Sequence, residues 1–542
     1  MNRKRAARRL VLVGLLISLG VNAAELPHFQ LNGGATQLMV QGVPYLALAG
    51  ELHNSSASSP QYMASIWDRL AQNGIHTVIG TASWELVEPE EGHYDFTAVD
   101  DEIKQAGDRQ MRLVLIWFGA YKNAESTYAP SWVRRDERRF PRGLRDPAVK
   151  PAGIAEFLKG PHLSVFGENL VVCDARAFAA LMQHIRKTDR TQTVIMMQVE
   201  NEAGIIGTAR DHSALADAAW GQSVPGPLMT YLLEHRASLR PELLEVWGRQ
   251  RFRAAGTWAE VFGTDAAAEE VFMAWAFATY INKIAKAGEA AYSLPMYANA
   301  WLGPQPGATH PGDYPSGGPV ARVMDVWKAA APALALLAPD VYVDDFDGTL
   351  SAFQRSDNPI FVPEARFNAG NLFVALGQHN AIAFSPFGIE DGKFDDEVLQ
   401  AYRLLNDMTP LITGAQAEGR IHGFSVSNGS PQKVSLSGYD LFIGPAVGTL
   451  GAFGPGTGTD PQTKTDGYGL VIGTDTDTFL IIGRGVSVRF SVGGNDAEID
   501  SAQEGMFRNG RWIPGRMLNG DERFFLFPNN ALRIVRVTLL RR

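Results

Sequence analysis

The chain has 542 residues, of which 45% are hydrophobic and 20% charged, and its formal net charge is −9. This composition is typical of a soluble globular protein with ample material for a large core, and the length predicts two or three domains. The negative charge argues against nucleic acid as a partner, because phosphates favour a concentrated basic surface. A neutral or polar substrate fits better.

Residues 1–24 have the pattern of a secretory signal peptide. Lys and Arg crowd positions 3–9, an apolar run spans Leu10–Val21, and the small residues Ala23 and Ala24 follow. We therefore expect export across the inner membrane to the periplasm, with an uncleaved membrane anchor as the alternative. No later run is long and apolar enough to span a bilayer, so no membrane association is expected after removal of the signal. Cys173 is the only cysteine, which rules out an intrachain disulfide.

From about residue 45 to 411, short apolar runs rich in β-forming residues alternate with helical patterns. Such alternation predicts βαβ units and a parallel sheet. Eight runs are expected as strands, at 45–50, 76–81, 112–119, 194–201, 295–301, 339–343, 359–365 and 381–388. Helices are expected between them, for example over 62–74, from Ala177 to Thr188, and from about Asp265 to Ala287. Eight such units predict a (β/α)8 TIM barrel over residues 25–411.

Two of the predicted connections are unusually long, at about 121–174 after the third strand and 203–264 after the fourth. Both follow the carboxyl end of a strand, where barrel enzymes build their active sites. Long ordered loops in compact domains are more often functional than idle. The two connections are therefore expected to shape the site.

After residue 411 the pattern changes to short alternating runs separated by Gly, Asp, Asn and Thr. This sequence pattern is typical of an antiparallel β domain, and we expect a β-sandwich over 412–542. The Gly-rich stretch at 454–460 superficially resembles a dinucleotide fingerprint but lacks the strand–turn–helix context, so we expect a loop there. The β domain is expected to support the barrel rather than bind polysaccharide.

Two acidic residues at the ends of predicted strands stand out as catalytic candidates. Glu202 follows the apolar run "MMQV" together with Glu200 and Asn201, and Glu364 follows Ile360–Val362. A carboxylate beside a packed core is costly unless it is hydrogen-bonded or used. Cleavage of a glycosidic bond requires one carboxylic acid and one carboxylate that face each other across a sugar. We expect Glu202 and Glu364 to form this pair, and Glu200 to be structural.

Several segments resemble glycoside hydrolase family 35, the β-galactosidases of clan A. The similar segments are "QVENEAG" (198–204), "GELHNSS" (50–56), "WELVEPEEGHYDF" (84–96) and "APSWV" (129–133). A further stretch, "GAYKNAESTYAPSW" (119–132), leans toward family 42 of the same clan. Together the likeness covers roughly residues 40–400.

The resemblance implies roles for individual residues. Glu202 corresponds to the family's acid/base, Glu364 to its nucleophile, and Asn201 to the amide that binds the sugar's 2-hydroxyl. Glu125, with Asn123 beside it, corresponds to a carboxylate that binds galactose hydroxyls, and Tyr342 to a tyrosine near the nucleophile. Departures from the family pattern at Ala82, Ser83, Glu85 and Asn123 place the sugar contacts in question.

Other candidates come from their places at strand ends. Glu51 and His53 are expected as cleft residues or as satisfied polar positions. Four aromatic residues are candidates for stacking on sugar rings, and we expect two of them to do so: Trp84, Trp117, Tyr121 and Trp301. The histidines form no zinc motif, and Asp344, Asp345 and Asp347 do not have the spacing of a cation loop, so neither a metal nor a cofactor is expected.

The resemblance implies a retaining, exo-acting β-galactosidase that removes terminal β-galactose from oligosaccharides, including xyloglucan side chains. One alternative is a clan A retaining β-glycosidase of different sugar specificity. Another is a non-catalytic carbohydrate-binding protein built on a barrel. The oligomeric state stays open.

Overall fold

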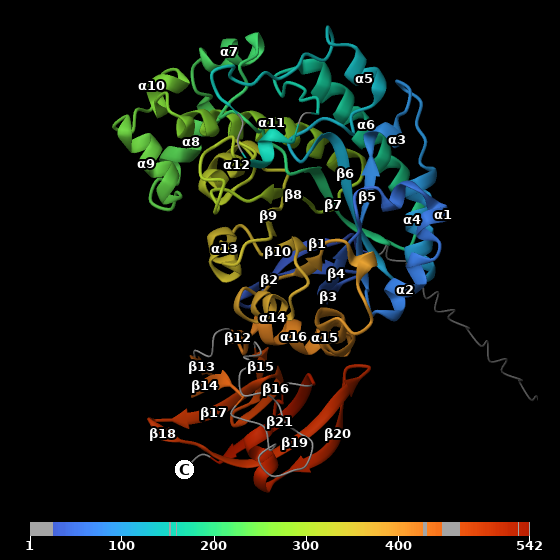
Figure 1. Cartoon of the computed structure of the whole chain (residues 1–542), viewed down its shortest axis with the longest axis vertical. Helices are drawn as coiled ribbons and strands as arrows, with labels where there is room; N and C mark the ends of the chain where they lie inside the picture. The colour runs from blue at the N-terminus through green and yellow to red at the C-terminus, as the bar shows by residue number, and fades with distance from the viewer. Residues whose placement is uncertain are drawn as a thin grey trace, which may run out of the picture.

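The computed structural model describes residues 25–150, 153–158, 160–426, 431–446, 467–528 and 531–540. The chain forms an elongated molecule with an α/β barrel at one end and antiparallel sheets at the other (Figure 1). The predicted signal peptide and the Gly-rich stretch at 454–460 lie outside the described residues. Within the described part, no helix combines the length and apolar character needed to cross a membrane.

Eight parallel strands close into the barrel in the order β10-β11-β4-β5-β6-β7-β8-β9. They are β4 (Ala47–Glu51), β5 (Thr77–Ser83), β6 (Arg112–Lys122), β7 (Val194–Asn201), β8 (Met296–Trp301), β9 (Leu336–Val341), β10 (Phe361–Ala365) and β11 (Ala383–Pro386). All but the last residue of β8 and the first of β6 are buried, which explains why the strands appear in the sequence as apolar runs rather than alternating patterns. The predicted TIM barrel is confirmed, and β9 begins three residues before the expected run.

Helices cover the outside of the barrel. The principal ones are α2 (Ile66–Gln72), α4 (Thr97–Asp108), α6 (Glu168–Thr188), α11 (Ala266–Ala291), α12 (Met324–Ala330), α13 (Phe346–Phe353), α14 (Ala369–Gln378), α15 (Glu397–Leu405) and α16 (Thr409–Ala417). The longest, α11, begins where Asp265 accepts a hydrogen bond from the amide of Ala268, as a helix N-cap should. It packs along α6.

A three-stranded antiparallel sheet precedes the barrel and was not anticipated. It consists of β1 (His28–Asn32), β2 (Ala35–Val40) and β3 (Val43–Tyr45), and β3 leads directly into β4. Leu38 and Val40 pack with the inward-facing barrel residues, so the sheet closes the end at which the strands begin. The missed signal was Asn32 followed by Gly33 and Gly34, a two-residue hairpin turn.

The two long connections differ in character. The one after β6 holds the short helices α5 (Ser131–Arg135) and η2 (Gly153–Glu156). The one after β7 is largely helical, with α7 (Ala214–Trp220), α8 (Gly226–Glu234), α9 (Pro241–Arg249) and α10 (Trp258–Phe262). Both lie beyond the carboxyl ends of the barrel strands, as expected.

The C-terminal region forms two antiparallel sheets around a shared apolar core, which confirms the predicted β-sandwich. The larger sheet contains β12 (Ile421–Val426), β15 (Gly467–Asp475), β16 (Thr478–Arg484), β21 (Arg533–Leu540), β19 (Glu498–Arg508) and β20 (Arg511–Leu518). The smaller contains β13 (Gln432–Leu436), β14 (Tyr439–Pro445), β17 (Val486–Val492) and β18 (Asn495–Asp496).

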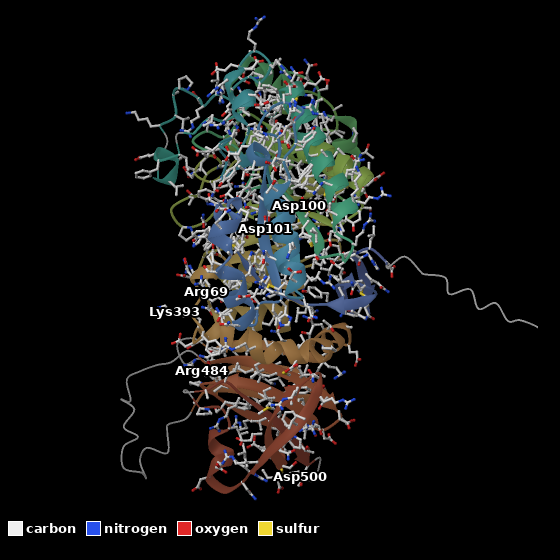
Figure 2. All side chains as sticks on the ribbon, turned by 90° about the vertical axis from the view of Figure 1, so that its right-hand side faces the viewer. Arg69, Asp100, Asp101, Lys393, Arg484 and Asp500 are labelled. Carbon is white, nitrogen blue, oxygen red and sulfur yellow. The ribbon has the colours of Figure 1, made fainter. Side chains whose placement is uncertain are left out.

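Strands β15 and β16 of the larger sheet are buried on both faces over most of their length, because their second face packs against the barrel. Tyr468, Leu470 and Ile472 of β15 belong to the main barrel core, whereas Val471 between them belongs to the sandwich core. Arg484 lies at the junction of the two parts (Figure 2) and pairs with Glu397 of α15, with 2.5 Å between Nη1 and Oε1. The boundary expected at residue 411 falls inside α16, whose first turn tolerates Pro410.

Candidate active site

A layer of polar side chains caps the barrel core at the carboxyl ends of the strands. Glu51 of β4, Lys122 of β6, Asn201 of β7, Asn299 of β8, Asp340 of β9 and Glu364 of β10 belong to it, and Glu202 follows β7 directly. All seven are buried. Placing so many polar groups next to an apolar core is costly unless they bond to one another, which is typical of a functional site.

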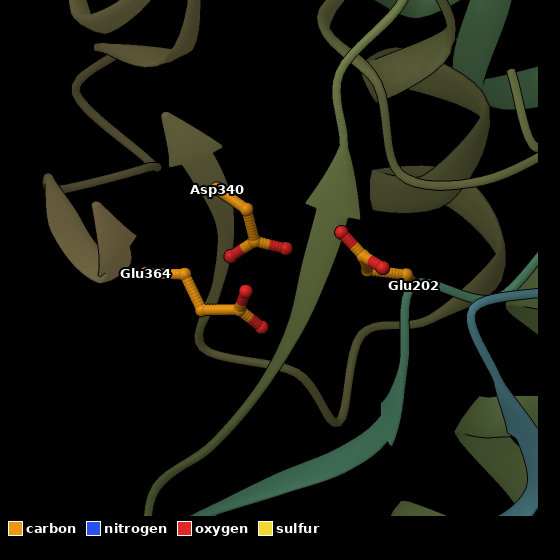
Figure 3. Close-up of side chains that lie close together, drawn as sticks. All are labelled: Glu202, Asp340 and Glu364. Carbon is orange, nitrogen blue, oxygen red and sulfur yellow. The ribbon is translucent and has the colours of Figure 1, made fainter. Parts of the chain in front are cut away.

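Glu202 and Glu364, far apart in the chain, meet across one gap together with Asp340. Each of the three carboxyl groups offers an oxygen, and these oxygens lie within 4.8 Å of one another. The three side chains point toward one another from separate elements (Figure 3). The expected pairing of Glu202 with Glu364 is therefore present in the structure.

Glu364 is held as a hydrogen-bond acceptor. Tyr342 donates its hydroxyl to Oε2 at 2.9 Å, and Asn201 donates Nδ2 to Oε1 at 3.2 Å. Asn299 adds a longer contact of 3.5 Å to Oε1. Because donors aimed at a carboxylate favour its ionised form, the contacts suit Glu364 to be the negatively charged member.

Glu202 is placed to hold a proton. Burial, and then the charge of Glu364, raise the pKa of Glu202 to about 8. Asn123 donates Nδ2 to Oε2 of Glu202 at 2.7 Å, and Asn299 accepts a hydrogen bond from the Glu202 amide at 2.9 Å. The surroundings of the two catalytic candidates therefore differ, because donors face Glu364 while burial and a neighbouring charge act on Glu202.

The backbone around Glu202 adopts an unusual conformation. Asn123, Ala124, Glu200 and Glu202 have φ values of 53°, 57°, 63° and 45°, in the left-handed region that residues other than glycine rarely occupy. Such strain persists only where the surrounding structure imposes it, and it concentrates at functional sites. These four residues form the turns that aim Asn123 and Glu202 into the gap.

Glu51 and Asp340 are further buried acids in the layer. Neither carboxyl oxygen of Glu51 has a hydrogen-bond partner, and Oδ1 of Asp340 also lacks one. Burial, followed by the charge of Glu364, holds the pKa of each well above its usual range. Lys122 opposes this effect and donates Nζ to Asn201 at 2.9 Å. Sequence reasoning named Glu51 but missed Asp340, Asn299 and Lys122, whose only signal was a polar residue within an apolar run or at its end.

Glu125 has a role in the loop as well as a place near the site. One of its oxygens accepts the amide of Gly160, which fastens the connection after β6. Its own amide donates to the carbonyl of Lys122 at 3.0 Å.

Glu200 is structural, as expected, since it accepts the amides of Ala120 and Tyr121 at 3.1 and 2.7 Å. His53 bonds Asp391 at 2.8 Å.

The expectation for Trp84 is wrong. Its side chain is fully buried, donates Nε1 to Glu88 at 2.8 Å and packs edge-on against Trp132, so no ring face is open to a sugar. Trp117 and Tyr121 are also fully buried. Trp301, at the end of β8, is the one member of the four that is partly exposed. Two stacking residues were expected from this set, and only Trp301 remains a candidate in the structure.

Residues 57–265 match the family model for glycoside hydrolase family 42, described as "Beta-galactosidase". The barrel contains a family 42-like domain. Residues 398–528 match a second model, described as "Domain of unknown function (DUF5597)". The first match places the resemblance with family 42 rather than specifically with family 35.

Two curated relatives are similar over part of the chain. A "Beta-galactosidase" from Xanthomonas manihotis is 27% identical over 199 residues, 35% of this chain and 28% of that protein. "Beta-galactosidase 14" from Arabidopsis thaliana is 28% identical over 139 residues, 24% of this chain and 16% of that protein. The chain thus spans less than a third of each relative's length. Among solved structures, a β-galactosidase from Bacillus circulans sp. alkalophilus aligns with TM-score 0.44 and 14% identity, over 68% of this chain and 57% of that one.

Proposed function

We propose that this protein is a retaining β-galactosidase. The observation that carries the proposal is the buried pair of Glu202 and Glu364, one with a raised pKa and the other held by hydrogen-bond donors, across a gap under 5 Å. The family model matched by residues 57–265, which include Glu202, supports galactose as the sugar.

Catalysis proceeds in two steps. Protonated Glu202 donates its proton to the glycosidic oxygen while Oε1 or Oε2 of Glu364 attacks the anomeric carbon, so the bond to the leaving group breaks as a glycosyl–enzyme ester forms. Glu202, now a carboxylate, removes a proton from water, which attacks the same carbon and releases Glu364. Formation of the ester removes the charge of Glu364, which lowers the pKa of Glu202 for its second role.

The spacing favours retention of configuration. Retaining glycosidases hold the two carboxyl groups about 5–5.5 Å apart, whereas inverting ones need about 6.5–9.5 Å to admit a water molecule. Oxygens of Glu202 and Glu364 within 4.8 Å of each other fit the first class. Asn201, at 3.2 Å from Glu364, is placed to bind the sugar hydroxyl next to the anomeric carbon.

The finer features form part of the proposal. We infer exo action on terminal galactose, export to the periplasm, and catalysis without a metal or organic cofactor. The natural substrate can be tested by assaying a panel of compounds. The panel contains galactosylated xyloglucan oligosaccharides, lactose, and aryl glycosides of galactose, glucose, mannose and arabinose. A different preferred sugar in this panel would favour another clan A β-glycosidase.

Azide rescue of two variants tests the mechanism. Glu364→Ala should lose at least about a thousandfold in kcat on an aryl β-galactoside, and azide should restore turnover with an α-galactosyl azide as product. Glu202→Ala should lose about 10²–10⁴-fold in kcat/KM on substrates with poor leaving groups but little in kcat/KM on activated aryl galactosides, because kcat/KM reports only the steps up to formation of the glycosyl–enzyme. With azide it should give the β-galactosyl azide.

The opposite configurations of the two azides serve as mutual controls, because each variant removes a different carboxyl group. A wild-type product of inverted configuration would refute the retaining mechanism. Tight binding of galactosides by the wild type without any turnover would favour the non-catalytic alternative.

A further inference from the structure

A small apolar cluster, separate from the main core, lies beside Glu202. Ala124, Ala155 and Ile206 are its buried members, and Leu158 and Trp301 pack against them. The five residues come from the connection after β6, the connection after β7 and the end of β8. We call this set the acid-side cluster.

The acid-side cluster is joined directly to the acid/base residue. The amide of Ala124 donates to the carbonyl of Glu202 at 3.2 Å, and the neighbouring Asn123 donates to the Glu202 carboxyl group. Trp301 lies in register with Asp340 on the adjacent strand β9. Asp340 is also in register with Glu364, so Ala124 and its neighbour Asn123 are what fix the cluster to Glu202. Glu364 is held separately, by Tyr342.

The position of the acid determines where the leaving group lies. Glu202 must reach the glycosidic oxygen, which is bonded to the aglycone, so the aglycone departs past the surroundings of Glu202. Glu202 itself is hydrogen-bonded to Asn123 and Asn299. The acid-side cluster next to it is aliphatic apart from the ring of Trp301. Subsites that bind a further sugar combine aromatic faces with several convergent polar groups, and the acid-side cluster supplies only apolar groups.

The short helix η2 extends the apolar surface outward. One face of its segment, at Ala155 and Leu158, packs into the cluster, while Ile154 and Phe157 on the other face are 48% and 80% exposed. The segment is anchored, since Arg145 donates to the Leu158 carbonyl at 2.8 Å and Gly160 donates to Glu125. Contiguous exposed apolar side chains mark binding surfaces more often than isolated ones do.

We propose that the leaving-group side of the site takes an apolar alkyl or aryl aglycone, with Trp301 and Leu158 as its inner wall and Ile154 and Phe157 at its outer edge. The assignment of this side rests on the proposed function, because it follows from Glu202 being the acid. The class of aglycone rests on the side chains of the cluster.

Binding of non-hydrolysable thiogalactosides tests the proposal without requiring turnover. Calorimetric titration of the wild type should show hexyl β-thiogalactoside binding at least about tenfold more tightly than the methyl compound, since each buried methylene contributes favourably. The same order should appear in kcat/KM for hexyl and methyl β-galactosides.

Two variants locate the effect. Phe157→Ser and Ile154→Ser should each reduce the hexyl-to-methyl ratio by about threefold or more, and exposure of both side chains should leave the melting temperature unchanged. Leu31→Ser is the matched control, because Leu31 is 71% exposed on β1 at the opposite end of the barrel. It should leave the ratio as it is.

Equal affinity for the two thiogalactosides in the wild type would overturn the proposal, as would a ratio that Phe157→Ser does not change. Tenfold better turnover of lactose than of hexyl β-galactoside would also overturn it, in favour of a sugar aglycone. An inert enzyme that nevertheless prefers the hexyl compound would refute the proposed catalysis and leave the apolar subsite standing.

Discussion

At the scale of single residues, the site is organised by how several acids share one buried space. Lys122 is the cation that acts on Glu51, Glu202 and Asp340, and Glu364 is the acid that receives aligned donors. Burial and the charge of Glu364 raise the pKa of the other three acids, and Lys122 opposes each shift. Under the proposed mechanism, this difference in surroundings suits Glu364 to be the nucleophile and Glu202 to be the acid.

The raised pKa of Glu202 predicts an alkaline limit to activity. Glu202 must carry a proton for the first step, and its pKa is about 8 in the free enzyme. We therefore expect kcat/KM on an alkyl β-galactoside to fall as pH rises through this value. A pH–rate profile from pH 5 to 10 measures the limb, and a midpoint below pH 6 would contradict the assignment.

Asp340 is predicted to be neutral in the working enzyme, because burial and the charge of Glu364 raise its pKa. Asparagine has the shape of a neutral aspartic acid, so Asp340→Asn should move the alkaline limb of kcat/KM by less than about half a unit. Were Asp340 ionised, removing its charge would lower the pKa of Glu202 and shift the limb by a unit or more toward acid. Asp340→Ala is the comparison, since it loses the 2.8 Å hydrogen bond from Asn299.

Glu102 of α4 lies outside the site but is also buried, and neither of its oxygens is hydrogen-bonded to a side chain. Burial holds its pKa well above the usual range. The folded state therefore binds more protons than the unfolded state, and the free energy of unfolding decreases as pH rises above about 4.5. Glu102→Gln should raise the melting temperature, by about 1 °C or more, with a gain that widens between pH 5 and 9. A gain that shrinks over this range would contradict the argument.

At the scale of elements, the contact between α14 and β12 couples the barrel to the sandwich. The backbones approach so closely that a Cβ atom on Gly423 would lie 1.7 Å from the carbonyl oxygen of Phe373. Gly377 faces the same strand, where a Cβ would lie 2.0 Å from the Gly423 amide. Glycine is required here by space rather than by backbone conformation.

Gly423→Ala is therefore expected to destabilise the protein by about 1–3 kcal/mol, because the helix and strand must separate. Gly414→Ala is the control, since α16 leaves open space at that position and alanine favours a helix, with an expected gain of about 0.5–1 kcal/mol. Denaturant unfolding of both variants gives the comparison. Equal stability of Gly423→Ala and the wild type would show that α14 and β12 can separate without a loss in the free energy of unfolding, which would contradict the prediction.

The barrel strands were predictable because burial on both faces turns each into an apolar run. Glu202 and Glu364 were predictable because acids at the ends of such runs have few structural explanations. Asp340 escaped notice because it sits inside the β9 run. Trp84 was misjudged because it contacts Glu88 at the end of α3 and Trp132 of α5, a helix in the connection after β6. Burial of a single side chain depends on packing between segments, which spacing along the chain does not encode.

At the scale of the whole molecule, the barrel and the sandwich share one continuous core. Tyr468, Leu470 and Ile472 belong to the barrel's apolar cluster although they lie in the C-terminal sheet. The domain boundary could not be placed from the sequence because α16 and β12 are parts of the same packed layer. The expected supporting role of the sandwich agrees with this arrangement.

The contact of α14 with β12 has a consequence for partial unfolding of the protein. The helix begins five residues after Glu364, and its opposite side rests on β12. Heat or denaturant that separates the sandwich from the barrel should therefore loosen the segment between Glu364 and α14, and with it the position of the Glu364 carboxyl group. Glu202 follows β7, which is separated from β10 by β8 and β9. Under the proposed function, separation of the sandwich is therefore expected to abolish cleavage before it abolishes sugar binding.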